Sequence, residues 1–264
     1  MKLTDENLQA WRALAELAAT QAGALLRQKL FEPRELKLKG FRDPVTDADV
    51  AAQQLITNLV RQHFPEHGFL AEEANSALPT AGPVHWIIDP LDGTSNYSRG
   101  IPEFCVSIAV AFEGEVVVGV IYDPMRDELF SGARGHGCTL NRQPLQPRTL
   151  PPLDDALVSL DWGRQEEIRQ AMFTTLGRFI HRVRSVRAIG TSALALAWVA
   201  AGRFDAYLNY HLSPWDFAAG YLLLQEAGGR VTDLAGQPLN LMANGPILAA
   251  TQSIHADLQK LVAQ

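Results

Sequence analysis

Apolar residues recur with helical spacing in two segments near the start of the chain. The first segment contains Leu8, Leu14, Leu17, Ala18 and Leu25, and the second contains Leu55, Ile56, Leu59 and Val60. This spacing places apolar side chains on one face of a helix, so the sequence predicts two amphipathic helices. The polar stretch 31–45 between them, which contains Pro33, Gly40 and Pro44, is typical of a mobile loop or a short hairpin.

The middle of the chain has a different pattern. Four runs are rich in β-branched and aromatic residues, and they cover residues 86–88, 105–111, 116–122 and 128–131. Glu113-Gly114 and Asp123-Pro124 lie between these runs as turn signals. We therefore expect a sheet that is built mainly from hairpins.

After residue 151 the pattern alternates between strand and helix. A strand-like run at 156–160 is followed by a helical set and a closing helix, whose apolar positions are Ile168, Met172, Phe173, Leu176 and Ile180, then Ile254, Leu258 and Leu261. Such alternation favours layered α/β packing. The prolines at 144, 147, 151 and 152 predict a boundary between an N-terminal half, about 1–148, and a C-terminal half, about 149–264. This segment is too short for an independent linker, so we expect one domain.

Composition narrows the class of protein. The chain has 264 residues, of which 47% are hydrophobic, so it can bury a large core. The formal net charge of -6 offers no basic face for direct nucleic-acid binding, although a small polyanion held through metal remains possible. The first residues do not resemble a signal peptide and no apolar stretch is long enough to span a bilayer, so we expect a cytoplasmic protein without a membrane role. Cys105 and Cys138 are too few for a disulfide framework, and we expect two buried thiols.

Two acidic clusters carry the first chemical signal. Glu72-Glu73 is one, and Asp89 to Asp92 is the other, which begins where the apolar run 84–88 stops. Several carboxylates at one strand end cannot all stay ionised without cations, so the pattern indicates a metal site. Gly93 and Thr94 can then present backbone N–H groups to an anion. Taken alone, Asp-Gly is an ordinary turn dipeptide and Glu-Glu an ordinary solvated pair.

Two further aspartates lie in helix-capping patterns. Thr46 and Asp49 are spaced as a capping box, and Ser213 and Asp216 repeat the form with a proline between them. Capping alone explains both pairs, but a capping carboxylate keeps a second oxygen for a metal or a water. The segment 190–192 (Gly-Thr-Ser) is a third helix start that can face an anionic or hydroxylated ligand.

Together these segments resemble the inositol monophosphatase family of lithium-sensitive, magnesium-dependent phosphatases. The matching residues are 45–49 (VTDAD), 72–73 (EE), 86–97 (WIIDPLDGTSNY), 190–192 (GTS) and 215–220 (WDFAAG). They follow the family's order and span most of the chain. The resemblance implies an α+β fold, a layered α-β-α-β-α sandwich, with the active site between the two halves and a homodimer as the assembly.

The resemblance also implies two or three Mg²⁺ ions per subunit. One ion would be held by Glu72, Asp89 and the main-chain carbonyl of Leu91, and a second by Asp89, Asp92 and Asp216. A third, weaker ion would lie near the glutamate.

The implied reaction is in-line attack of a metal-activated water on a small phosphorylated metabolite, with no covalent phosphoenzyme. Thr94 and Asp49 would activate the water, beside Glu72 as a metal ligand. The phosphate and the rest of the substrate would be bound by Asp92, Gly93, Thr94, Gly190 and Ser192. Glu73 would support the site from behind its ligands.

The sequence predicts the substrate less specifically than the reaction. In inositol-specific members a glutamate before the Trp-Asp segment binds substrate hydroxyl groups, and Asn209 takes that place here, which puts strict inositol specificity in doubt. Fructose 1,6-bisphosphate, histidinol phosphate, adenosine 3',5'-bisphosphate and NADP remain alternatives. A different class also remains, a regulatory protein-binding module associated with transcription machinery. The complete set of metal-site carboxylates favours catalysis.

Overall fold

The computed structural model describes residues 2–32, 36–40, 43–73, 81–145 and 152–263. The two predicted N-terminal helices are α1 (Asp5–Lys29) and α2 (Asp47–His63). Between them β1 (Leu36–Gly40) and β2 (Asp43–Thr46) pair antiparallel, which confirms the hairpin alternative. Residues 33–35 and 41–42 of that stretch lie outside the described residues.

Most of the predicted helical positions face a core, and a few do not. The buried face of α1 includes Leu8, Trp11, Leu14, Ala15, Ala18, Ala19, Ala22 and Leu26. Leu17 fits the apolar pattern but is 44% exposed, and Phe173 in the later helix is 65% exposed. Periodicity alone therefore identified the helices, but it assigned some exposed residues to the buried face.

The strand runs in the middle of the chain form one seven-stranded sheet with the order β3-β4-β5-β6-β7-β8-β9. Its strands are β3 (Gly68–Ala71), β4 (Val84–Asp92), β5 (Cys105–Phe112), β6 (Glu115–Asp123), β7 (Glu128–Ala133), β8 (Cys138–Leu140) and β9 (Gln143–Pro144). Only β3 and β4 pair parallel in this sheet, and the other neighbours are antiparallel. The expected hairpin sheet is confirmed.

The later residues build a five-stranded mixed sheet with the order β11-β10-β12-β14-β13. The strands are β10 (Leu157–Leu160), β11 (Ser185–Arg187), β12 (Ala206–Leu212), β13 (Arg230–Thr232) and β14 (Gly245–Ala250). The helices of this part are α4 (Glu166–Phe179), α5 (Ser192–Ala200), α6 (Pro214–Glu226) and α7 (Gln252–Val262). Two 3-10 turns, η1 (Leu153–Asp155) and η2 (Ile180–Arg182), complete it.

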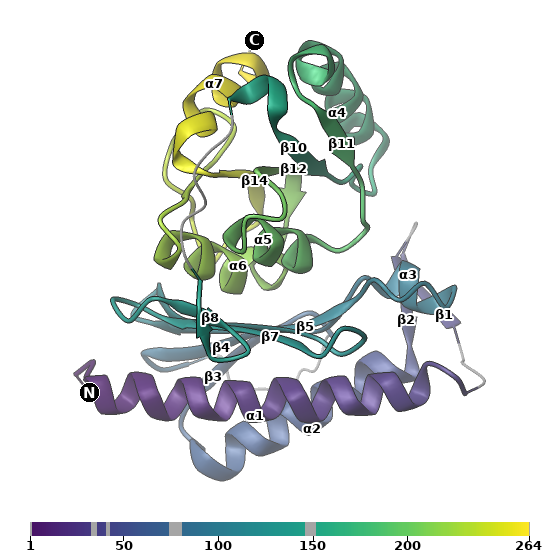
Figure 1. Ribbon diagram of the computed structural model, residues 1–264. Helices are drawn as coiled ribbons and strands as arrows, with labels where there is room; N and C mark the ends of the chain where they lie inside the picture. The colour runs from purple at the N-terminus through teal and green to yellow at the C-terminus, as the bar shows by residue number, and fades with distance from the viewer. Residues whose placement is uncertain (1, 33–35, 41–42, 74–80, 146–151, 264) are drawn as a thin grey trace.

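These elements stack as five layers (Figure 1). α1 and α2 cover one face of the seven-stranded sheet, α5 and α6 lie between the two sheets, and α4 and α7 cover the outer face of the five-stranded sheet. The layered α-β-α-β-α sandwich is therefore confirmed. The division of the chain near residue 148 stays a prediction, because residues 146–151 lie outside the described part. Within that part, no helix is both long and apolar enough to cross a membrane.

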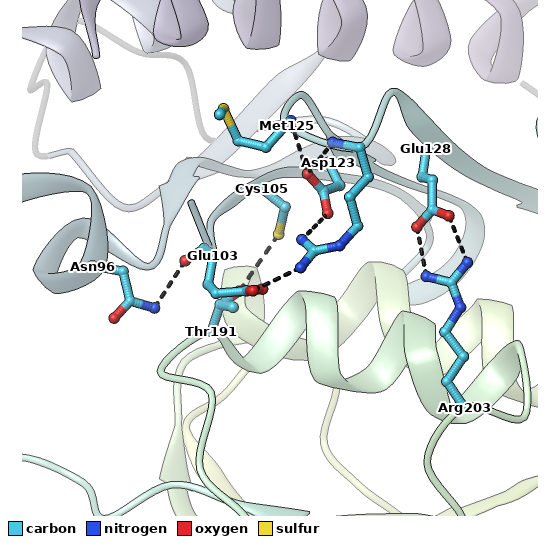
Figure 2. Close-up of polar contacts among 9 residues, drawn as sticks. Asn96, Glu103, Cys105, Asp123, Met125, Glu128, Thr191 and Arg203 are labelled. Atoms are coloured by element: carbon cyan, nitrogen blue, oxygen red, sulfur yellow. Dashed lines mark hydrogen bonds and ion pairs between the residues drawn. The ribbon is translucent and has the colours of Figure 1, made fainter. Parts of the chain in front are cut away.

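Polar contacts join the seven-stranded sheet to the segments that flank α5 (Figure 2). Arg203, which follows α5, forms a two-pronged ion pair of 2.6 and 2.5 Å with Glu128 of β7. Cys105 lies 3.6 Å from the Thr191 hydroxyl at the start of α5. Both cysteines, Cys105 and Cys138, are free and buried, as expected.

The contact between β6 and α6 requires a glycine at position 119. A Cβ built on Gly119 would lie 2.6 Å from the main-chain oxygen of Ala219, which cannot move away as a flexible side chain can. We expect Gly119→Ala to lower the free energy of unfolding by about 1–3 kcal/mol, because overpacking costs that much in a dense core. Gly177→Ala is the matched control, since nothing lies within 4 Å of its Cβ position. Chemical unfolding compares the two, and equal stabilities would contradict the expected clash.

Candidate active site

The carboxyl end of β4 supplies two of the predicted carboxylates. Pro90 has no N–H to donate to a sheet, and the pairing register with β5 shifts between Asp89 and Asp92. The Leu91 N–H donates instead to Asp89 Oδ1 at 2.9 Å. Regular pairing of β4 with β5 is therefore interrupted at the point where the acidic residues of β4 begin.

A left-handed turn at Gly93 connects β4 to the short helix α3 (Thr94–Ser98). Gly93 has a φ of 98°, and a Cβ there would lie 2.8 Å from the main-chain oxygen of Glu103. Only glycine fits this turn without strain. The turn brings the Thr94 hydroxyl to 3.1 Å from Asp49 Oδ1 and 3.0 Å from the Leu91 carbonyl oxygen.

Asp49 lies behind Thr94, at the start of α2. The predicted capping box is present, with Asp49 Oδ2 accepting hydrogen bonds from the Thr46 N–H at 2.8 Å and from its hydroxyl at 2.5 Å. Burial raises the pKa of Asp49, while the hydrogen bonds from Thr46 oppose the rise. Asp49 is fully buried and does not line the cavity described below, so any effect on a substrate must pass through Thr94.

The glutamate pair follows β3, which runs parallel to β4 and ends beside it. The Glu72 N–H donates to the Ile88 carbonyl of β4 at 3.0 Å. The Gln53 side chain on α2 holds the next residue, since it accepts from the Glu73 N–H at 3.0 Å and donates to the Glu73 carbonyl at 2.8 Å. Glu72 lines the cavity, whereas Glu73 is buried away from it.

The remaining predicted carboxylates meet helix starts. Asp92 Oδ2 accepts from the Thr191 hydroxyl and from the Ala193 N–H, each at 2.6 Å, at the beginning of α5. Asp216 lies in the first turn of α6, where its Oδ2 accepts from the Ser213 N–H at 2.7 Å. These bonds orient one oxygen of each carboxylate, and through them α5 and α6 both begin at the same site.

Crowding of these acids perturbs their ionisation. Burial and the neighbouring charges of Glu72, Asp92 and Asp216 raise the pKa of Asp89 well above its usual range. Burial raises the pKa of Asp92 to about 7, although the hydrogen bonds that it accepts oppose the rise. Burial, then the charges of Asp92 and Glu72, raise the pKa of Asp216 as well. A bound cation would relieve this accumulation of negative charge.

The carboxylate oxygens of this site are suitable ligands for Mg²⁺, but the side chains are not arranged around a single point as they would be around a bound ion. Within the described ranges, no three Asp, Glu, His or Cys side chains are arranged to hold a metal as they stand. Asp89, Asp92 and Asp216 each use an oxygen for a hydrogen bond within the chain. Mg²⁺ prefers oxygen ligands, needs only one or two carboxylates and keeps several waters. Each of these carboxylates has a second oxygen that could bind the ion.

These residues line one open cavity of about 890 Å³. The predicted site residues along its wall are Glu72, Asp89, Leu91, Asp92, Gly93, Thr94, Gly190, Ser192, Asn209 and Asp216. The sequence interpretation missed Arg99, Arg164 and Arg169, which also line it, and one carboxylate, Asp161. A usable signal for Asp161 existed, since it follows the strand-like run 156–160 as Asp89 follows the run 86–88.

Asn209 lines the cavity and is already engaged within the chain. Its Oδ1 accepts from the His211 N–H at 3.0 Å, and its Nδ2 donates to the Tyr207 hydroxyl at 3.2 Å. These two bonds use the amide oxygen and one of the two amide protons of Asn209.

Comparison with known proteins places this arrangement in a family. The model of the inositol monophosphatase family matches residues 7–264. The Nus factor SuhB of Escherichia coli strain K12 is 39% identical over 244 residues, which are 91% of each chain. The solved inositol monophosphatase of Anabaena is 39% identical with a TM-score of 0.84, over 98% of this chain and 97% of that one. An IMPase/NADP phosphatase solved with Mg²⁺ and phosphate is 27% identical with a TM-score of 0.86, over 97% of this chain and 95% of that one. With a match over nearly its whole length and relatives at this identity, the chain belongs to the inositol monophosphatase family.

Proposed function

We propose that the protein hydrolyses a small phosphate monoester of a polyol or sugar, inositol monophosphate or a related compound, with Mg²⁺ and by direct attack of water. Family membership identifies the chain as a phosphoric monoester hydrolase. The observation that carries the proposal is the convergence of Glu72, Asp89, Asp92 and Asp216, from three separate segments, on one open cavity. Catalysis of this type depends mainly on positioning and charge stabilisation.

The proposed ligands are Glu72, Asp89 and the Leu91 carbonyl for one ion, and Asp89, Asp92 and Asp216 for a second. When bound, Mg²⁺ lowers the pKa of water and neutralises phosphate charge. The relative solved with Mg²⁺ and phosphate supports this choice of metal. A third ion near Glu72, and the lithium sensitivity implied by the family resemblance, belong to the same proposal.

The other residues orient the reactants. Thr94 is positioned to hold the attacking water, because its hydroxyl contacts Asp49 and can pass a proton toward that carboxylate. The N–H groups of Gly93 and Thr94 at the start of α3 suit a phosphate oxygen. Gly190, Ser192 and Asn209 line the same cavity and are proposed to contact the alcohol part of the substrate. Glu73, whose main chain is bonded to the Gln53 side chain, is proposed to support the loop that carries Glu72.

A phosphate-release assay tests this function. With Mg²⁺, we expect turnover of myo-inositol 1-phosphate and slower turnover of phenyl phosphate, and we expect chelation by EDTA to stop both. The panel also includes fructose 1,6-bisphosphate, histidinol phosphate, adenosine 3',5'-bisphosphate and NADP, which rank the alternative substrates. Absence of phosphate release from every compound in the presence of Mg²⁺ would overturn the proposal.

A second candidate function rests on the relative named Nus factor SuhB. In this alternative the chain is a regulatory module that binds transcription machinery through a protein surface. The formal net charge of -6 argues against direct nucleic-acid contact. Recovery of RNA polymerase components with a protein that is inactive toward all the phosphate esters would favour this function over catalysis.

We propose that the protein is a homodimer, as the resemblance to the family implies, and that it is cytoplasmic. Light scattering across a dilution series measures the subunit number, and a monomer at all concentrations would contradict the dimer.

A further inference from the structure

Asp161 is a carboxylate of the cavity wall that the proposed metal set does not use. It follows β10 directly and lines the same cavity as Asp92 and Asn209. Its Oδ1 accepts from the Gly190 N–H at 3.0 Å, and its Oδ2 lies 3.1 Å from the Tyr207 hydroxyl. The carboxylate is therefore held in one orientation from both sides.

The direction of each hydrogen bond at the Tyr207 hydroxyl follows from which neighbouring groups can donate and which can only accept. Asn209 Nδ2, 3.2 Å from the phenol oxygen, can only donate, and the Asp161 carboxylate can only accept. The single phenol proton has two acceptors within reach, Asp161 Oδ2 at 3.1 Å and Ser192 Oγ at 2.8 Å. The charged carboxylate is the stronger acceptor, so we assign the proton to Asp161, and the Ser192 hydroxyl then donates to Tyr207. The amide of Asn209 cannot be reversed, because its Oδ1 accepts from the His211 N–H.

With these protons assigned, the Asp161 carboxylate still has acceptor positions that a ligand in the cavity can use. An ionised carboxylate has about four acceptor positions, and Asp161 uses two of them for Gly190 and Tyr207. The remaining positions suit a neutral O–H donor. They do not suit a phosphate oxygen, since two negative charges would repel each other.

We propose that Asp161 determines specificity by accepting a hydrogen bond from a free hydroxyl group of the substrate alcohol, with the spare N–H of Asn209 donating beside it. The inference rests on the proposed phosphatase function and narrows its substrate class. The preferred substrate is the monoester of a polyhydroxylated alcohol, and a monoester whose alcohol has no second hydroxyl group is handled poorly.

The first test compares two substrates of the wild-type protein with Mg²⁺. Myo-inositol 1-phosphate and cyclohexyl phosphate share a six-membered ring, but the second has no free hydroxyl group. We expect kcat/KM to be at least about 10-fold higher for the inositol ester, as expected for a hydrogen bond to a charged group. Equal values for the two ring esters would overturn the inference while leaving the phosphatase function intact. No release from either ester or from phenyl phosphate would instead overturn the function.

The second test uses Asp161→Asn, with Asp154→Asn on exposed η1 as the matched control. For myo-inositol 1-phosphate, we expect Asp161→Asn to raise KM about 10-fold or more and to change kcat by less than about threefold. Phenyl phosphate turnover and the Mg²⁺ concentration for half-maximal rate should stay within about twofold. Equal losses on both substrates would assign Asp161 a purely structural role, and a shifted Mg²⁺ dependence would assign it to the metal site. Either outcome would overturn the inference.

Discussion

Replacing Asp89 with asparagine is expected to abolish phosphate release while the protein stays folded. Asp89 is the residue proposed to contact both ions, and loss of its charge would lower kcat about 10³-fold or more. This magnitude follows because metal stabilisation of a phosphoryl group amounts to several kcal/mol, and 1.36 kcal/mol is tenfold in rate. Wild-type rates for Asp89→Asn in saturating Mg²⁺ would defeat the mechanism.

Thermal unfolding separates the loss of metal from a loss of fold. Burial and neighbouring acids raise the pKa of Asp89, so its negative charge lowers the stability of the folded protein when no cation is bound. We therefore expect the Tm of Asp89→Asn in EDTA to equal or exceed the wild-type Tm. Added Mg²⁺ should raise the Tm of the wild type and have little effect on the variant. Asp257→Asn, at an exposed position of α7, is the control, and it should respond to Mg²⁺ as the wild type does.

The second large effect is expected at Thr94. Thr94→Ala removes the hydroxyl that lies 3.1 Å from Asp49 Oδ1 and leaves that buried carboxylate without this donor. Proton transfer by a positioned group contributes about 10²–10⁴-fold, so we expect kcat to fall about 10²-fold or more. KM should change much less, because the backbone N–H groups that would contact the phosphate remain. Steady-state phosphate release measures both constants.

Thr94→Ser is the matched control, since serine keeps the hydroxyl and loses only a methyl group. We expect it to retain kcat within about tenfold. If Thr94→Ala has an unchanged kcat, the hydroxyl has no part in water activation, and Asp49 would be a helix cap alone. A fall in kcat of equal size in both variants would point to packing around Thr94 as the cause.

Local patterns predicted much of the fold, because they depend on neighbours along the chain. Helical spacing identified α1, α2 and α4, and β-branched runs identified β4, β5, β6 and β7. Both capping boxes were predicted from four-residue segments, since a cap forms within one turn of its helix. The same patterns could not decide which apolar side chains are exposed. Phe173 fits its helix pattern, yet its side chain is 65% exposed.

For the candidate site too, some features follow from the sequence and others only from the tertiary structure. By itself the sequence determined which segments are acidic and where they begin, since Asp89 and Asp92 end a buried strand and Asp49 and Asp216 start helices. Only the tertiary structure placed Asp49 behind Thr94, 45 positions away, and oriented Asp161 through Tyr207. Sheet register and helix packing set these contacts between distant segments, and neither is encoded in the spacing of residues within one segment.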